Sequence, residues 1–203
     1  MTVAETRRAV LTRRVRLLVA ATIAYNVVEA VVALAAGSVA GSPALIGFGL
    51  DSVIEVSSAA AVAWQFSGPD PEARERTALR VIALSFFALA AYVTVESTRA
   101  LLTGAEPGHS PVGLTLAAVS LAVMPVLSGL QRRAGRELGS RTAVADAKQT
   151  LLCTYLSAVL LVGLALNSLA GWTWADPLAA LVIAAVAVRE GREAWRGDAC
   201  ACR

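Results

Sequence analysis

The sequence predicts an all-α membrane protein, a polytopic bundle of six transmembrane helices with both termini in the cytoplasm. Of the 203 residues, 57% are hydrophobic and 16% are charged, and the mean hydropathy is +0.64. These values are typical of integral membrane proteins. Six apolar stretches meet or approach the ~20 residues that a spanning helix needs. Basic residues gather at every second helix boundary, which indicates the orientation.

The six expected helices follow one another closely and occupy nearly the whole chain. By residue number they are 17–37, 44–66, 81–102, 112–130, 147–170 and 174–188. We therefore divide the chain into a basic cytoplasmic N-terminal segment (1–16), a six-helix transmembrane domain (17–195) and a short cytoplasmic tail (196–203). We expect no folded soluble domain.

Lys and Arg side chains cluster before the first helix, between the second and third, between the fourth and fifth, and after the sixth. They are Arg7, Arg8, Arg13, Arg14, Arg16, Arg74, Arg76, Arg80, Arg132, Arg133, Arg136, Arg141, Lys148, Arg189, Arg192, Arg196 and Arg203. Arg99 alone falls toward the opposite face. Since basic residues near helix ends stay in the cytoplasm, this pattern explains the pI near 9.1. We expect the lipid bilayer as a partner and no nucleic acid.

Two carboxylates lie near the centre of the second expected helix, in IGFGLDSVIEVSSAAAVAW (46–64). Asp51 and Glu55 are one turn apart and therefore share a face. An ionisable side chain at the centre of a spanning helix costs roughly 2.5–3.5 kcal/mol, so it usually faces a partner, a cavity or an ion path. The alternative is pairing with Lys or Arg, but no basic residue lies at comparable depth. The pair therefore indicates a metal site or a proton site.

The fifth expected helix carries a second pair with the same spacing, Gln149 and Cys153 in ADAKQTLLCTYLSAVLL (145–161). The second and fifth helices enter the membrane from opposite sides, so the two pairs meet at similar depth if these helices are neighbours. Two carboxylates, an amide oxygen and a thiolate suit a borderline divalent ion. We expect zinc, with cadmium, cobalt or iron as related ions.

Three further polar residues are candidates for an accessory role. Asn26 and Glu29 lie one turn apart on the first helix. They extend the metal site, form a proton relay, or make a hydrogen-bonded packing pair between helices. Asp146 either caps the fifth helix or guards its cytoplasmic mouth.

Structural explanations are favoured for other polar groups. Asp176 before Pro177 is the pattern of a helix N-cap followed by proline in the first turn, so we expect it to cap the sixth helix. Glu96 and Arg99, near an outer helix end, are interpreted as interfacial groups. Cys200 and Cys202 lie in the tail, where we expect no regular structure, and their role stays open.

Two segments resemble a known family. GSPALIGFGLDSVIEVSS (41–58) and ADAKQTLLCTYLSAVLLVGL (145–164) are similar to the second and fifth helices of the cation diffusion facilitators. In that family an Asp-x-x-x-Asp pair and a His-x-x-x-Asp pair hold the metal. By resemblance, Asp51 and Glu55 take the first two ligand positions, Gln149 falls at the His position and Cys153 at the second Asp position.

The resemblance runs from about 21 to 195 and concerns the transmembrane domain, with no counterpart of the family's cytoplasmic C-terminal domain. It implies a homodimeric secondary transporter that exports a divalent metal, zinc above all, by proton antiport in a bacterial-type plasma (inner) membrane. The alternative is a non-transporting membrane relative that acts as a metal-sensing or interaction protein. We expect no enzyme, because the chain has no phosphate-binding glycine loop, Ser/His/Asp set or His-rich zinc-hydrolase motif.

Overall fold

The computed structural model describes residues 3–66, 71–139 and 141–196, which form six helices joined by short connections. The helices are α1 (Val3–Ala40), α2 (Pro43–Phe66), α3 (Pro71–Thr103), α4 (Pro111–Leu138), α5 (Arg141–Ala170) and α6 (Ala175–Arg196). Within these ranges there is no strand. The expected all-α class and the six helices are therefore confirmed.

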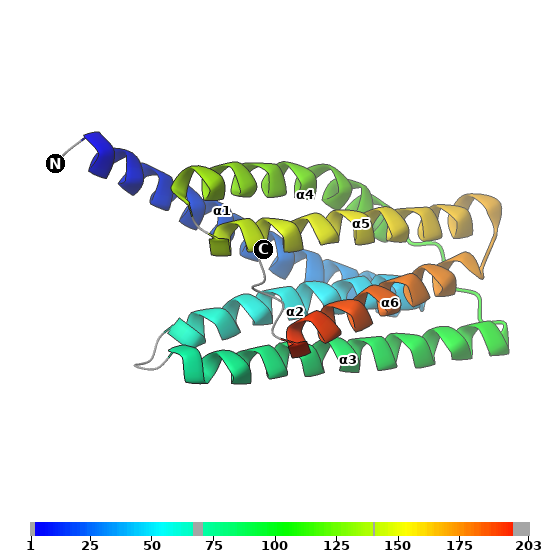
Figure 1. Cartoon of the computed structure of the whole chain (residues 1–203). Coiled ribbons are helices and arrows are strands. Elements are labelled where there is room, and N and C mark those ends of the chain that lie inside the picture. Colours follow the sequence, from blue (N-terminus) through cyan, green and yellow to red (C-terminus); the bar gives the residue numbers. More distant parts are fainter. Residues whose placement is uncertain (1–2, 67–70, 140, 197–203) are drawn as a thin grey trace.

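The helices form an elongated bundle in which consecutive helices run in opposite directions (Figure 1). α4 packs against α5, α3 against α6, and α1 lies against both α2 and α4. α2 occupies the most connected place, because it contacts α1, α3, α6 and also α5. The expected neighbourhood of the second and fifth helices is thus present.

The two ends of the bundle differ in charge. One end of the bundle carries the start of α1, the ends of α2 and α4, the starts of α3 and α5, and the end of α6 (Figure 1). We call it the arginine end because the basic clusters belong to these helix ends. The connections α1–α2, α3–α4 and α5–α6 lie at the other end, called here the Asp176 end. The alternation of basic residues in the sequence therefore corresponds to two spatially separate ends.

Five helices, α1 to α5, are long and apolar enough to cross a membrane by length and composition. The described helix outside this set is α6, whose last turns carry Arg189, Glu190, Arg192, Glu193 and Arg196. Its apolar part is correspondingly short. Packing against α3, α5 and α2 places α6 in the bundle nonetheless.

Several helices extend beyond the apolar stretches that predicted them. α3 begins at Pro71 rather than near residue 81, and α4 continues to Leu138 rather than ending near residue 130. Hydropathy marks the part of a helix that lies in lipid, whereas the backbone hydrogen bonds continue into water. Three helices begin at a proline, Pro43, Pro71 and Pro111, because the first helical position needs no N–H donor and favours the φ angle of proline.

Small residues allow the helices to approach closely. At Gly163 on α5, an added Cβ would lie 2.6 Å from Ala179 Cβ on α6 and 3.3 Å from the Ala175 carbonyl oxygen. At Gly191 on α6, it would lie 2.9 Å from a ring carbon of Phe87 on α3. At both positions a larger residue would force a neighbour to shift, and such close approach at small residues is a usual basis of helix packing in membranes.

Asp176 caps a different helix from the one that the sequence predicts. α6 begins at Ala175, so Asp176 lies inside its first turn and the prediction that it is the N-cap of this helix is wrong. Its carboxylate instead accepts hydrogen bonds from Ser42 Oγ and from the Ala44 N–H at 3.3 Å, both at the start of α2. Ser42 Oγ in turn accepts from the Leu45 N–H at 3.0 Å. A buried negative charge at this N-terminus also complements the helix dipole.

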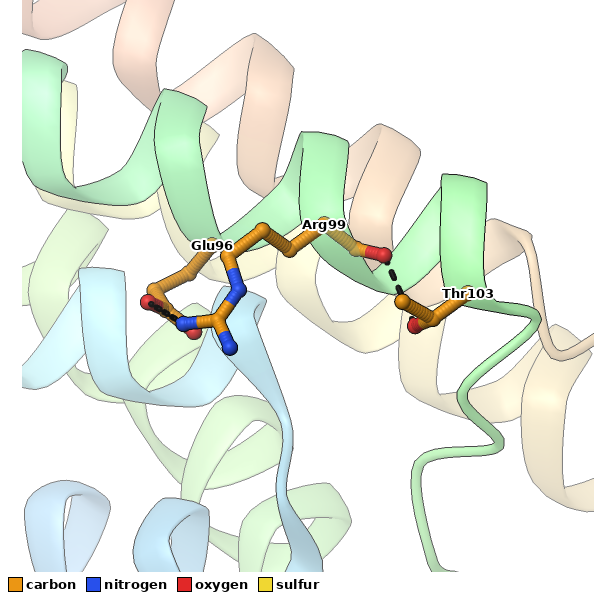
Figure 2. A network of polar contacts seen from close by, with 3 residues as sticks. All are labelled: Glu96, Arg99 and Thr103. Atoms are coloured by element: carbon orange, nitrogen blue, oxygen red, sulfur yellow. Dashed lines mark hydrogen bonds and ion pairs between the residues drawn. The ribbon is translucent and has the colours of Figure 1, made fainter.

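Glu96 and Arg99 form an ion pair along the outside of α3, with 3.3 Å between Glu96 Oε1 and Arg99 Nη1 (Figure 2). Both side chains are exposed, and the next turn continues with Thr103 Oγ1 donating to the Arg99 carbonyl oxygen at 2.8 Å. Arg99 lies in the part of α3 that approaches the Asp176 end. This placement agrees with a surface role for the pair.

Candidate metal site

The α2–α5 contact brings together two of the four predicted metal ligands. Cys153 Sγ on α5 donates a hydrogen bond to Glu55 Oε2 on α2, with 2.8 Å between the two atoms. The Cys153 side chain is buried and Glu55 is partly buried. A thiol and a carboxylate in direct contact can exchange the shared proton for a cation, which is how metal binding displaces protons from such ligands.

Asp51 lies one turn before Glu55 on α2 and is partly buried. The charges of Glu55, Glu29 and Glu190 all act on its carboxylate. Gln149 lies one turn before Cys153 on α5 and is also partly buried. The i, i+4 spacing places each of these residues on the same helix face as its partner.

The four predicted ligands do not form a closed metal cage in this conformation. Among the side chains that the structure describes, no three from His, Cys, Asp and Glu converge closely enough to hold a metal ion. The Glu55–Cys153 contact is therefore the assembled part of the predicted set. Asp51 and Gln149 flank it along their helices.

Glu29, predicted as an accessory group, is buried at the meeting point of three helices. Ser52 Oγ on α2 donates to Glu29 Oε2 at 2.8 Å, and Ser120 Oγ on α4 donates to Glu29 Oε1. The Tyr25 hydroxyl lies 2.7 Å from Ser120 Oγ. Asn26, one turn before Glu29, is equally buried, and its Oδ1 atom has no hydrogen-bond partner. Glu29 thus bonds to neighbouring helices rather than to Asn26.

The structure says nothing about three other predicted positions. The side chain of Asp146, and Cys200 and Cys202 in the tail, fall outside the described residues. Their predicted roles stay predictions.

Sequence reasoning missed several polar neighbours of these carboxylates. Ser52 follows Asp51 directly, but a serine in an apolar helix usually bonds to its own backbone and attracts no attention. Ser120 and Tyr25 give no sequence signal, because their importance depends on which helices pack together. Glu190 lies far along the chain, yet α6 packs against α2 and brings its charge within range of Asp51.

A comparison with protein-family models finds a match over most of this bundle. Residues 77–196 match the model of the cation efflux transmembrane domain. This segment is more than half of the chain. The chain belongs to the cation efflux family. It is therefore a multi-pass membrane protein of a family that transports metal cations.

The family match covers α3 to α6, including Gln149 and Cys153, and begins after Asp51 and Glu55. One curated relative is named as an uncharacterized transporter, sll1263, from Synechocystis sp. (strain ATCC 27184 / PCC 6803 / Kazusa). It is 27% identical over 158 residues, which cover 73% of this chain and 51% of the relative. The chain thus spans about half the length of this relative. The expected resemblance to the transmembrane domain of cation efflux proteins is confirmed.

Proposed function

We propose that this cation efflux protein is a secondary transporter of a divalent metal cation, with zinc as the foremost cargo and cadmium, cobalt or iron as related ones. The observation that carries the proposal is the 2.8 Å contact between Glu55 and Cys153 across α2 and α5. Asp51 lies one turn away on α2 and supplies a second carboxylate. Carboxylate and thiolate together favour zinc and its softer neighbours over magnesium or calcium.

Metal binding at this place releases protons. Cys153 ligates a metal only as the thiolate, so the hydrogen bond from Sγ to Glu55 is replaced by two bonds to the cation. The departing thiol proton links metal occupancy to proton concentration. Exchange of metal for protons from the opposite side of the membrane follows if the loaded and protonated forms open to different sides.

In this proposal, closure of the site moves α2 relative to α5. The described conformation pairs Glu55 with Cys153 but leaves the complete ligand set open. We propose that the metal draws Asp51 into the pair, with the Gln149 amide oxygen assisting. A site that is assembled by the cargo itself couples occupancy to helix position, which is what alternating access needs.

The orientation and assembly follow from the same proposal. The arginine end is placed in the cytoplasm by the positive-inside rule, in a bacterial-type plasma (inner) membrane. Export of metal then runs from the arginine end toward the Asp176 end. Exposed apolar side chains on the helix surfaces, such as Leu17, Leu84 and Val162, are available to lipid and to a second copy of the chain in a homodimer.

A second candidate is a non-transporting relative that senses metal or binds another protein. It is favoured by the fifth-helix pair, in which Gln149 and Cys153 stand where the resemblance places His and Asp. Metal flux distinguishes the two. A transporter moves zinc into proteoliposomes and acidifies or alkalises their lumen, whereas a sensor binds metal without flux.

The decisive experiment is calorimetry of Zn²⁺ binding to the detergent-purified chain, with Asp51→Ala beside the wild type. We expect the variant to lose at least about 100-fold in affinity, because groups that only support metal ligands already account for about 10- to 100-fold. Glu96→Ala is the matched control, since it removes an exposed carboxylate on α3. Equal affinity of wild type and Asp51→Ala contradicts the assignment.

A further inference from the structure

Glu29 is the centre of a second polar cluster, built from α1, α2 and α4. Its side chain is 1% exposed. Both carboxylate oxygens are held by serine hydroxyls, Oε2 by Ser52 and Oε1 by Ser120. Its hydrogen bonds run to serines on α2 and α4, whereas Cys153 of the Glu55–Cys153 contact lies on α5.

Within the described residues, no ion pair with a basic side chain balances the negative charge of Glu29. The ion pairs formed within the described ranges are Arg99–Glu96, Arg133–Glu137 and Arg189–Glu193, all exposed. None of them includes Glu29. A carboxylate within a spanning helix is strongly disfavoured unless a cation or a proton neutralises it.

The groups that donate hydrogen bonds to Glu29 are serine hydroxyls. Besides the two serine hydroxyls, Asn26 Oδ1 is buried without a hydrogen-bond partner, one helical turn from Glu29. An acceptor that lacks a donor in a buried place is explained when a cation or an additional proton stands beside it. Carboxylate, hydroxyl and amide oxygens are the ligands of hard cations. Because the cluster contains a single carboxylate, a cation with one positive charge neutralises it.

The hydroxyl groups can turn their lone pairs toward such a cation. Ser52 Oγ lies 3.2 Å from the Phe48 carbonyl oxygen, which gives its proton an alternative acceptor. Between Tyr25 and Ser120, either hydroxyl can be the donor. When these hydroxyl protons turn away from Glu29, the serine oxygens can accept rather than donate. They can then bind an ion together with the carboxylate, without any movement of the helices.

A groove of about 460 Å³ between α1 and α4 leads to this cluster. Tyr25 and Glu29 lie on its wall, together with apolar side chains such as Val28 and Leu116. Pro111, the first residue of α4, borders the groove on the side of the Asp176 end. The cluster therefore borders a groove that lies between α1 and α4 and not at the α2–α5 contact.

We propose that Glu29, Ser52, Ser120 and Asn26 form a second cation site, which binds a hard monovalent cation, either Na⁺ or a proton. The proposal that a cation binds here stands independently of the proposed metal transport. Its role as the site of the counter-ion that is exchanged for the divalent metal rests on the proposed function.

Other titratable groups lie near Glu29, and their contributions to any pH dependence must be distinguished from that of Glu29. They are Tyr25 on the same helix, Asp51 on α2 and Cys153 on α5, on all of which the charge of Glu29 acts. α4 faces Glu29 with the hydroxyl of Ser120. A comparison of the wild type with Glu29→Gln isolates the contribution of Glu29, because the neighbours are the same in both proteins.

The test is thermal unfolding of the detergent-purified chain in the presence of EDTA, so that no divalent metal takes part. One arm replaces choline chloride by NaCl at constant ionic strength, and the other lowers the pH in choline chloride. A cation that binds the folded state alone raises the unfolding midpoint with its concentration. We expect the wild type to respond in one arm, which identifies the cation as Na⁺ or the proton, and Glu29→Gln to lose that response.

Two variants guard against a failure of Glu29→Gln to fold. Ser52→Ala and Asn26→Ala each remove one oxygen, and we expect the apparent affinity for the cation to fall about tenfold in each. Glu96→Gln, on the exposed face of α3, is the control and keeps the wild-type response. The proposal is overturned if the wild type responds in neither arm, or if Glu29→Gln shifts the midpoint by a constant amount and keeps the dependence on cation, since that result indicates packing alone.

Discussion

Cys153 on α5 donates its thiol proton to Glu55 on α2, with 2.8 Å between Sγ and Oε2. The two residues are far apart in the sequence and come from helices that otherwise touch only locally. This contact joins the two halves of the predicted ligand set. A replacement of Cys153 that keeps this hydrogen bond can therefore change the preference for a metal without disturbing the fold.

Cys153→Ser is expected to change which metal binds rather than whether the protein folds. The serine hydroxyl can keep the hydrogen bond to Glu55, but it is a harder ligand than a thiolate. We expect the affinity for Cd²⁺ to fall at least about tenfold more than the affinity for Mn²⁺. Calorimetry with both ions measures this ratio, in a Cys200→Ser/Cys202→Ser background that removes the tail thiols. Parallel losses for the two ions contradict a role of the thiol in selection.

Asp176→Asn and Ser42→Ala are expected to destabilise the start of α2. Each change removes part of a buried cap, and a lost buried hydrogen bond typically costs about 1–3 kcal/mol. Because the two groups bond to each other, the double variant is expected to lose less than the sum of the single variants. Thermal unfolding in detergent measures the three changes. Ser38→Ala, at an exposed hydroxyl that bonds to its own helix, is the control and should stay within about 0.5 kcal/mol of the wild type.

Gly163→Ala is expected to push α5 and α6 apart. The new methyl group would stand 2.6 Å from Ala179 Cβ, and overpacking of this kind typically costs about 1–3 kcal/mol. Gly129→Ala on α4 is the matched control, because an added Cβ there meets nothing within 4 Å. The control should be neutral or stabilise the helix by up to about 1 kcal/mol. A stabilising effect of both changes would show that the α5–α6 contact is looser than described.

Glu190→Gln is expected to alter the dependence of stability on pH. Burial raises the pKa of Glu190 near the arginine end, the charge of Glu193 adds to this rise, and Arg189 opposes it. A raised pKa in the folded state means that the charged form weakens the fold, so wild-type stability falls as the pH rises through that pKa. Gln carries no such charge. The midpoint of thermal unfolding should therefore be higher in the variant than in the wild type at neutral pH, with the difference vanishing in acid; a difference independent of pH contradicts this explanation.

The sequence determined the elements of this fold and most of its chemical candidates. Apolar stretches long enough for a bilayer predict the helices, and the alternation of basic residues predicts that the start of α1 and the end of α6 share one end of the bundle. Asp51, Glu55 and Glu29 stand out without any structure, because ionisable side chains in apolar helices are costly. Helix bounds were less accurate, as α3 shows, since hydropathy reports the lipid-facing part of a helix and not its end.

Tertiary structure alone decided how these residues are paired. Asp176 caps α2 rather than its own helix, because the packing of α6 against α2 offers it Ser42 and the Ala44 N–H. Glu29 bonds to Ser52 and Ser120 on two other helices rather than to Asn26 beside it. Helical periodicity specifies which side chains of one helix lie on the same face. The partner of such a side chain on another helix depends on which helices touch and at what height. That is a property of the packed bundle.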